Sequence, residues 1–449
     1  MVQLKEDSVA AFYAEKSIFI TGGTGFLGKV LIEKLLYSCK AVDQIYVLIR
    51  KKKDQTPSER IAQLLESELF SRLRKDDPSA LKKVVPVVGD LTMPNLGLSA
   101  AVQDLIVTKV SIIFHVAATV KFNERMKNAL ANNVEATREV INLCHRLEKV
   151  DAFIHVSTAY SNTDQKVVEE RVYPPPAPLS EVYAFVTNNG DDMDIIQNLL
   201  NGRPNTYTYT KALAEDIVLK EHGGIPTAII RPSIVLSVLK EPIPGWLDNW
   251  NGPTGLLHAS SQGVHCSMLG SGSNVADLIP VDIVTNLMIV VASRCKKSNG
   301  LKVYNSCSGT TNPIAYQAFT KMFLDSCISR GWNKVPFPML LFVKWAFLNR
   351  VLKFFLVIVP FFLIDVYLRF FGKPNYMRMI TYTKKAEDLM TFFTSHEWQF
   401  KDGNVRDLIN MMSPEDRKIF YCDPDEIHWK PYFDDYCVGV FKYLLKRKV

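Results

Sequence analysis

The sequence predicts an α/β fold with a doubly wound parallel sheet and a small, mainly helical C-terminal domain. A short apolar run at 18–20, a glycine-rich turn at 21–28 and a helix-like pattern at 29–36 follow one another near the start of the chain. Beyond them, short apolar runs alternate with segments of helical periodicity, as parallel strands joined by crossover helices require. The 449 residues are too many for one ordinary core, so we expect more than one domain.

The glycine-rich turn is the first candidate site. Glycines let the backbone turn tightly and approach a phosphate, while the free amides at a helix N-terminus attract its negative charge. A strand, such a turn and a helix in this order predict a dinucleotide site. The residues predicted to contact the cofactor are Thr21, Gly22, Gly25, Phe26, Leu27 and Gly28. The alternative is a tight strand–helix turn that binds no ligand.

The second predicted strand indicates which dinucleotide binds. The apolar run at 45–49 ends at Arg50, which is followed by lysines at 51–53. Sites for NAD usually place an acidic residue about 20 positions after the glycines, to bind the ribose 2′-hydroxyl. A guanidinium there can bind a 2′-phosphate through two hydrogen bonds. Arg50 therefore predicts NADPH, and the alternative is a solvated basic turn.

Three more strand-like runs follow. The runs at 84–91, 112–118 and 153–160 read as the third, fourth and fifth strands. Small residues such as Ala117 at the end of the fourth would let its backbone lie against the nicotinamide, although a plain buried strand also explains them. The fifth run carries Ser157 and Thr158 near its end.

The segment from Tyr207 to Lys211 predicts the chemistry. Tyr207 and Lys211 are four residues apart, so on a helix their side chains share one face. A phenol has a pKa of about 10, and a neighbouring ammonium should lower it. Lys211 would also hold the ribose hydroxyls. Tyr207 would protonate the oxyanion formed when hydride reaches a carbonyl, and Thr158, or alternatively Ser157, would hydrogen-bond that oxygen. The pattern predicts a carbonyl reductase.

Composition limits the partners and the compartment. The formal net charge is +7 without a stripe of basic and aromatic residues, which argues against nucleic acid and favours anionic cofactors and membrane surfaces. Eight scattered cysteines without a C-x-x-C pair predict buried thiols in a reducing compartment, and neither a disulfide framework nor a metal site. The N-terminus lacks a signal-peptide pattern, so we expect a catalytic part that faces the cytosol.

An apolar segment at 337–371 raises the question of a membrane. Five charged residues interrupt it, and its longest uncharged run, Phe354–Ile364, contains Pro360. A helix that spans a membrane needs about 20 consecutive apolar residues, more than this run contains. We therefore expect a helical pair lying in the interface, with its cations reaching the headgroups. The alternative is an apolar subdomain packed on the core.

Several longer stretches resemble the alcohol-forming fatty acyl-CoA reductases, a family of extended short-chain dehydrogenase/reductases. They are Ile18–Gly28, Val156–Tyr160, Arg203–Glu215, Thr227–Val235, Asp277–Asp282, Phe392–Phe400 and Ile427–Tyr432. The resemblance implies a Rossmann-type, NADP-binding reductase domain over 1–330, a membrane-associating or acyl-covering segment over 331–375 and a helical C-terminal domain over 376–449.

The resemblance also suggests roles for other residues. Asp90 and Leu91 match the adenine contact, and the segment 132–137 matches a helix whose Asn holds the active-site backbone. Arg231 follows a strand at the cofactor rim, where a structural pairing is equally expected. His115 and His155 are expected to be core histidines, and Cys144 and Cys266 to be packing residues.

The implied reaction is NADPH-dependent reduction of long-chain acyl-CoA to fatty alcohol, with release of CoA and an aldehyde-level intermediate. The implied partners are the acyl-CoA and a membrane surface, on the peroxisome or the endoplasmic reticulum. One alternative is an extended reductase acting on a steroid or another lipid carbonyl. Another is a non-catalytic protein that binds lipid surfaces.

Overall fold

The computed structural model describes residues 8–51, 54–190, 193–297, 300–372 and 376–447. The chain forms two compact units. The first unit comprises Met1–Ser233, Val281–Cys307 and Phe400–Asp423, and the second comprises Ile234–Pro280, Ser308–Gln399 and Pro424–Val449. Both units thus draw on separate stretches of sequence, whereas the resemblance implied three consecutive segments divided near 330 and 375.

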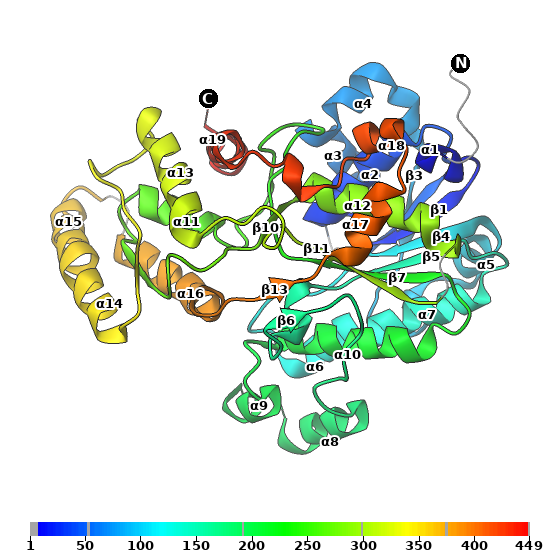
Figure 1. Cartoon of the computed structure of the whole chain (residues 1–449), viewed down its shortest axis with the longest axis horizontal. Coiled ribbons are helices and arrows are strands. Elements are labelled where there is room, and N and C mark those ends of the chain that lie inside the picture. Colours follow the sequence, from blue (N-terminus) through cyan, green and yellow to red (C-terminus); the bar gives the residue numbers. More distant parts are fainter. Residues whose placement is uncertain (1–7, 52–53, 191–192, 298–299, 373–375, 448–449) are drawn as a thin grey trace. The chain divides into compact units, whose positions relative to one another are not determined.

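A seven-stranded sheet in the order β11-β7-β5-β4-β1-β2-β3 forms the centre of the first unit (Figure 1). Its strands are β1 Ser17–Thr21, β2 Ile45–Ile49, β3 Val84–Val88, β4 Val110–His115, β5 Ala152–Val156, β7 Thr227–Pro232 and β11 Lys302–Ser306. Every neighbouring pair is parallel. The strand order reverses between β1 and β4, where doubly wound folds bind nucleotides. The predicted doubly wound sheet is confirmed.

Helices cover both faces of this sheet, which explains why β1, β2, β4 and β5 are buried along their whole length. The helices of the first unit are α1 Val9–Phe12, α2 Phe26–Ser38, α3 Pro57–Glu66, α4 Ser71–Asp76, α5 Ala100–Lys109, α6 Met126–Ala129, α7 Ala136–Arg146, α8 Leu179–Asn189, α9 Met193–Leu200, α10 Thr206–Glu221, α12 Val281–Arg294, α17 Gly403–Asn410 and α18 Pro414–Ile419. Helices α2 and α12 pack together on one face, while α7 and α10 pack together on the other (Figure 1).

The fifth strand ends earlier than the sequence suggested. It stops at Val156, and a 3₁₀ turn over Ala159–Asn162 follows. The Thr158 hydroxyl caps this turn by accepting a hydrogen bond from the Tyr160 amide at 3.3 Å. Ser157 and Thr158 therefore lie just beyond the carboxyl end of β5, at the edge where the nucleotide site is expected.

Residues 400–423 belong to the first unit, and hydrogen bonds join them to parts of that unit that are far away in the sequence. The Lys401 amide donates to the Val168 carbonyl at 2.9 Å, next to the short paired strands β6 (Val167–Val168) and β13 (Gln399–Phe400). The Tyr421 hydroxyl donates to Asp282 on α12 at 2.5 Å. The expected C-terminal helices exist, but they are shared between the two units.

The second unit combines short parallel strand pairs with helices. Its strands are β8 Ile234–Leu236, β9 Ser267–Leu269, β10 Leu278–Pro280 and β12 Leu341–Val343. Its helices are α11 Thr254–Ser261, α13 Tyr316–Ser329, α14 Ala346–Lys353, α15 Val359–Arg369, α16 Tyr376–Ser395 and α19 Trp429–Gly439. Strand β8 pairs with β10, and β9 with β12.

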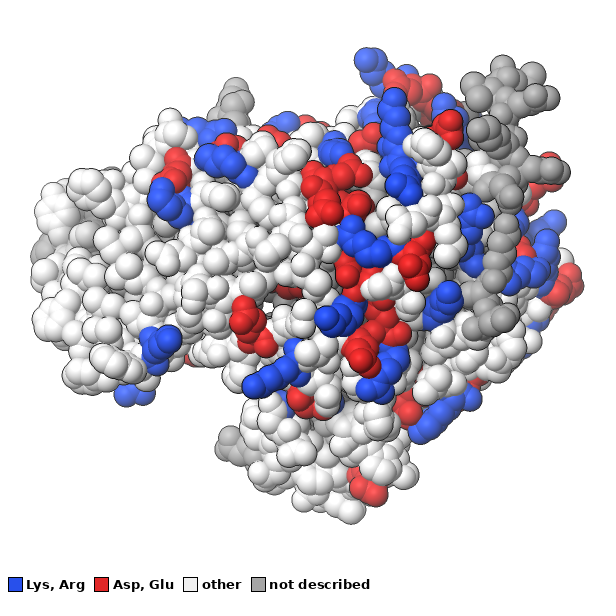
Figure 2. Space-filling model, viewed as in Figure 1, with Lys and Arg blue, Asp and Glu red and all other residues white. Residues whose placement is uncertain are grey.

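Helices α14 and α15 are one continuous helix, Ala346–Arg369, joined by the π-helical turn η7 (Phe354–Ile358). The π turn lies just before Pro360, which lacks an amide hydrogen and crowds the preceding turn. By length and composition this helix could cross a membrane, with a mean hydropathy of 2.3. The sequence suggested a helical pair in this segment, whereas the structure has one continuous helix. Figure 2 shows an almost uncharged surface over α14 and α15.

A buried charge within this apolar helix has a structural partner. The Asp365 carboxylate accepts hydrogen bonds from the amides of Tyr376 and Met377, at 2.7 and 2.8 Å. These amides open α16, so the carboxylate satisfies donors that a helix N-terminus leaves free. Asp365 therefore links α15 to α16.

Candidate active site

The glycine-rich turn has the tight backbone that a pyrophosphate site needs. Gly22 has a φ of +74°, and a Cβ there would lie 2.6 Å from the amide nitrogen of Ala117. A Cβ on Gly28 would lie 2.3 Å from the Gly22 carbonyl oxygen. Gly25 caps α2, and Phe26 and Leu27 form its first turn. Only glycine fits at 22 and 28, so the chain has the cradle that a dinucleotide requires.

Thr21 connects this turn to the fourth strand. Its hydroxyl lies 2.7 Å from His115 Nδ1 and accepts a hydrogen bond from the Ala117 amide at 3.3 Å. Thr21 is fully buried, so its side chain holds the ends of β1 and β4 together. Thr21 and Ala117, both predicted cofactor contacts, thus lie in contact with each other.

The other predicted cofactor residues lie at the ends of β2 and β3. Arg50 is exposed directly after β2, and Lys51 beside it is also exposed, whereas Lys52 and Lys53 lie outside the described residues. The Asp90 carboxylate accepts hydrogen bonds from the Thr92 amide at 3.0 Å and the Thr92 hydroxyl at 2.8 Å. Leu91 is partly exposed. These residues occupy the carboxyl edge of the sheet with the glycine turn.

Tyr207 and Thr158 are brought together at the same edge. Tyr207 is partly exposed in the first turn of α10, which the Asn205 side chain caps by accepting from the Thr208 amide at 2.9 Å. Burial raises the pKa of Tyr207 to about 12, and a hydrogen bond with the Thr158 side chain opposes this shift. The phenol is therefore protonated at neutral pH and can act as an acid.

Lys211 lies one helical turn after Tyr207, as predicted, but its ammonium has a different partner. Its Nζ donates to the Val156 carbonyl oxygen at 2.6 Å, and the side chain is 1% exposed. Burial lowers the pKa of Lys211 to about 8, opposed by Glu215. The expected lowering of the Tyr207 pKa by this lysine is not found, because the Tyr207 pKa responds to burial and to Thr158 and not to Lys211.

Asn133 joins the helix of Tyr207 to the loop after β4. It lies in a π-helical turn, Leu130–Glu135, and its Oδ1 accepts from the Thr119 amide at 2.9 Å. Its Nδ2 donates to the Thr210 hydroxyl at 3.0 Å. Asn133 is buried, so these bonds fix the backbone beside Ala117 relative to α10.

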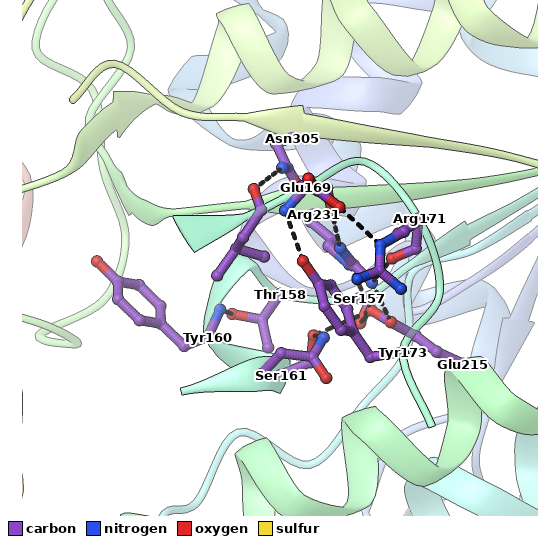
Figure 3. A network of polar contacts seen from close by, with 12 residues as sticks. Ser157, Thr158, Tyr160, Ser161, Glu169, Arg171, Tyr173, Glu215, Arg231 and Asn305 are labelled. Carbon is purple, nitrogen blue, oxygen red and sulfur yellow. Dashed lines mark hydrogen bonds and ion pairs between the residues drawn. The ribbon is translucent and has the colours of Figure 1, made fainter. Parts of the chain in front are cut away.

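Ser157 and Arg231 belong to a separate buried network (Figure 3). The Ser157 hydroxyl donates to Glu215 Oε1 at 2.5 Å, and Arg231 makes two hydrogen bonds to the same carboxylate, at 2.9 and 2.6 Å. Arg231 also donates to the carbonyls of Glu169 and Arg171, at 3.0 and 2.8 Å. Of the two possibilities for Arg231, the geometry fits the structural pairing, since the guanidinium is fully buried.

Sequence reasoning missed Glu215, although the spacing contained a signal for it. Glu215 follows Lys211 by four residues, as Lys211 follows Tyr207, so all three belong to one face of α10. Its carboxylate accepts from Ser157, Ser161 and Arg231. These hydrogen bonds join α10 to the turn after β5 and to β7.

His115, His155 and the cysteines are buried as predicted. His115 and His155 face each other on β4 and β5 with ring centroids 5.4 Å apart, and burial lowers both pKa values. All eight cysteines, which include Cys144 and Cys266, are buried free thiols. A role in packing fits them.

Two family models match this chain. Both are described as male sterility protein: an NAD-binding model matches residues 20–288, and a second model matches 356–447. The chain is 40% identical to fatty acyl-CoA reductase 1 of Xenopus laevis and 39% identical to that of Homo sapiens, each over 98% of this chain and 87% of the relative. It is 37% identical to fatty acyl-CoA reductase 2 of Mus musculus, over 98% of this chain and 86% of the relative.

Solved structures confirm the fold. The terminal R domain of the myxalamid pathway is similar with a TM-score of 0.61 and 19% identity, over 95% of this chain and 91% of that domain. A reductase domain of a nonribosomal peptide synthetase from Mycobacterium tuberculosis has a TM-score of 0.61 and 16% identity, over 99% and 96%. With the two family models and the identities near 40%, the protein belongs to the fatty acyl-CoA reductases, a family of NAD(P)-binding oxidoreductases.

Proposed function

We propose that the protein reduces long-chain acyl-CoA to the fatty alcohol with NADPH and releases CoA. The observation that carries this proposal is the hydrogen-bonded pair of Tyr207 and Thr158 beside Lys211, at the sheet edge that holds the glycine cradle. The relatives named fatty acyl-CoA reductase support the choice of substrate.

The cofactor site fits a dinucleotide, since Gly22 and Gly28 leave room where any side chain would clash. The backbone of the turn at 21–28 would hold the pyrophosphate at the start of α2. Arg50, exposed at the end of β2, would pair with the 2′-phosphate. When bound, NADPH supplies one hydride for each of the two reductions.

Lys211 would hold the ribose. An ammonium has three hydrogens, and the Val156 carbonyl accepts one of them. The other two are available to the ribose hydroxyls. Asn133 would position Lys211 and Tyr207 relative to the nicotinamide, because it joins α10 to the backbone after β4.

In the first reduction, Thr158 donates a hydrogen bond to the thioester oxygen and Tyr207 gives that oxygen a proton as the carbonyl carbon is reduced. The resulting hemithioacetal breaks its carbon–sulfur bond, and CoA leaves as the thiolate while the hydroxyl proton returns to the Tyr207 phenolate. The aldehyde remains against the same two side chains. In the second reduction Tyr207 protonates the aldehyde oxygen and the alcohol forms, after which Tyr207 regains a proton from solvent.

The helix Ala346–Arg369 would attach the protein to a membrane on which long acyl chains reside. Its exposed apolar side chains include Phe347, Phe355 and Tyr367, and only 17% of its most apolar stretch is buried. Lys344, Arg350 and Arg369 would interact with lipid headgroups. The peroxisome and the endoplasmic reticulum both offer such a cytosolic surface.

Product analysis tests this function. Purified protein with hexadecanoyl-CoA and NADPH should release free CoA and hexadecanol, with two NADPH consumed per alcohol. Tyr207→Phe should lower kcat by at least about 100-fold, the range of general acid catalysis. Tyr209→Phe is the matched control, because Tyr209 lies buried on the same helix. Aldehyde as the sole product, or no turnover of any acyl-CoA, would contradict the proposal.

A further inference from the structure

The second unit contains a cavity of about 720 Å³, a size typical of small-molecule sites. Its walls come from α14 and η7, from α16 and from the chain at β9. The described residues that line it all belong to the second unit, and the candidate catalytic residues belong to the first. None of the candidate catalytic residues lines this cavity.

Most of the wall is apolar. The apolar lining residues are Val264, Leu269, Ala346, Val351, Phe354, Phe355, Val357, Ile358 and Ile380. Four of them belong to η7, where the π turn adds a residue to the helix and so widens it. Such a wall favours a hydrocarbon chain.

One part of the wall is polar, and most of its groups satisfy one another. The Ser267 hydroxyl donates to Asn349 Oδ1 at 2.7 Å, and Asn349 Nδ2 donates to Glu387 Oε1 at 3.2 Å. Lys353 pairs with the other oxygen of Glu387. Asn349 and Glu387 are buried. This chain of bonds joins β9, α14 and α16, and a ligand is not needed to complete it.

His265 is different. It lines the cavity and is 2% exposed, yet its Nε2 has no hydrogen-bond partner among the described residues. Burial lowers the pKa of His265 to about 3, and Lys353 acts in the same direction, so the ring is neutral. A buried polar nitrogen without a partner is costly. The Nε2 atom is itself closed off from solvent, so a ligand hydroxyl reaches it only when the ring turns toward the cavity. A hydroxyl there would remove that cost, because a hydroxyl can donate or accept.

The charges at the rim do not select a strongly charged ligand. Arg350 and Lys384 are exposed there together with the acidic Asp388. The aromatic rings of Phe354 and Phe355 are also exposed, and both lie on the helix that we propose contacts the membrane. The best match is a neutral hydroxyl attached to a long apolar chain.

We propose that this cavity binds a long-chain primary alcohol, with its hydroxyl at His265 and its chain along η7 and α16. This inference rests on the proposed function, since the alcohol would be the product of the reductase site. The cavity would hold the product before it enters the bilayer, at the helix that contacts the lipid.

A photoreactive probe tests the site. The probe is hexadecanol with a diazirine at the end of its chain, and the corresponding alkane without the hydroxyl is its control. The full-length protein is irradiated with each probe in the absence of NADPH and acyl-CoA, and labelled peptides are identified by mass spectrometry. The alcohol should label peptides of α14, η7 and α16 at least 5-fold more than the alkane does.

Three variants locate the binding. His265→Phe keeps a ring but removes Nε2, so labelling by the alcohol should fall about 5- to 10-fold, the value of one hydrogen bond, while alkane labelling is unchanged. Ile380→Trp fills the cavity and should abolish labelling by both probes. Leu389→Trp makes the same kind of change on α16 outside the lining and should preserve it.

Other outcomes would overturn the inference. Equal labelling by alcohol and alkane, labelling confined to other peptides, or a phospholipid extracted from this cavity would each contradict it. Turnover of acyl-CoA is measured separately on the same preparation. Normal turnover without labelling refutes the cavity proposal alone, whereas specific labelling without turnover refutes the reductase function alone.

Discussion

Lys211 Nζ donates a hydrogen bond to the Val156 carbonyl oxygen at 2.6 Å, inside the first unit and with almost no exposure to solvent. This bond fixes the ammonium at the end of β5, one helical turn from the acid Tyr207. It also holds the ammonium in one place, as the proposed contact with the ribose would require. The cost is a buried charge, which lowers the pKa of Lys211 to about 8.

The first prediction concerns pH. Lys211 is charged below its pKa and neutral above it, so its hold on the ribose should weaken as the pH rises through about 8. The kcat/KM for NADPH should therefore fall above that pH. Lys211→Arg keeps its charge at every accessible pH. This variant should be less active, and its pH profile should lack the fall in kcat/KM for NADPH. A fall at the same pH in the variant would show that another group titrates.

The second prediction separates the two hydroxyls after β5. Thr158 forms a hydrogen bond with Tyr207, the proposed general acid, whereas Ser157 forms a hydrogen bond with Glu215. Thr158→Val should lower kcat about 100-fold or more, because a donor to the reacting oxygen is lost. Ser157→Ala should instead lower the free energy of unfolding by about 1–3 kcal/mol, since a charged acceptor loses a partner. Steady-state kinetics and urea unfolding of both variants measure this. Equal losses of kcat would contradict it.

The third prediction concerns the buried pair of Glu215 and Arg231. Arg231→Met leaves the Glu215 carboxylate buried without its cation, which should cost about 3–5 kcal/mol of stability. Adding Glu215→Gln should recover part of that loss, because the amide carries no charge. A double-mutant cycle by urea unfolding gives the coupling. Additive effects would show that the two groups do not depend on each other.

The parts of the site predicted from sequence depend on local spacing. The glycine turn, the Tyr207–Lys211 pair and the strand ending near Thr158 are each contained in a few consecutive residues. The network of Glu215 and Arg231 is not, because it joins a helix, a strand and the backbone at 169–171. The sequence did not predict that residues 400–423 belong to the first unit, for the same reason. Their partners, such as Val168 and Asp282, are far away in the sequence.

The fourth prediction concerns the choice of cofactor. Arg50 is exposed at the end of β2, where a 2′-phosphate would lie. Arg50→Ala should remove a charge-assisted hydrogen bond to the 2′-phosphate, so the KM for NADPH should rise about 10-fold or more. The KM for NADH should stay unchanged, because NADH lacks this phosphate. The two cofactors serve as controls for each other. A similar rise for both would show that Arg50 supports the fold of the turn rather than binding phosphate.

The fifth prediction concerns the exposed apolar helix. Phe347 and Tyr367 are 78% and 64% exposed there, so acidic residues at both positions should leave the fold intact. Acidic side chains resist entry into lipid, and Phe347→Glu with Tyr367→Glu should weaken binding to phospholipid vesicles at least about 10-fold in flotation. Met411→Glu is the matched control, because Met411 is 70% exposed on the first unit. Turnover of a short, soluble acyl-CoA should be the same in the double variant, the control variant and the unaltered protein. If flotation of the double variant matched that of the control, this helix would not be the membrane contact.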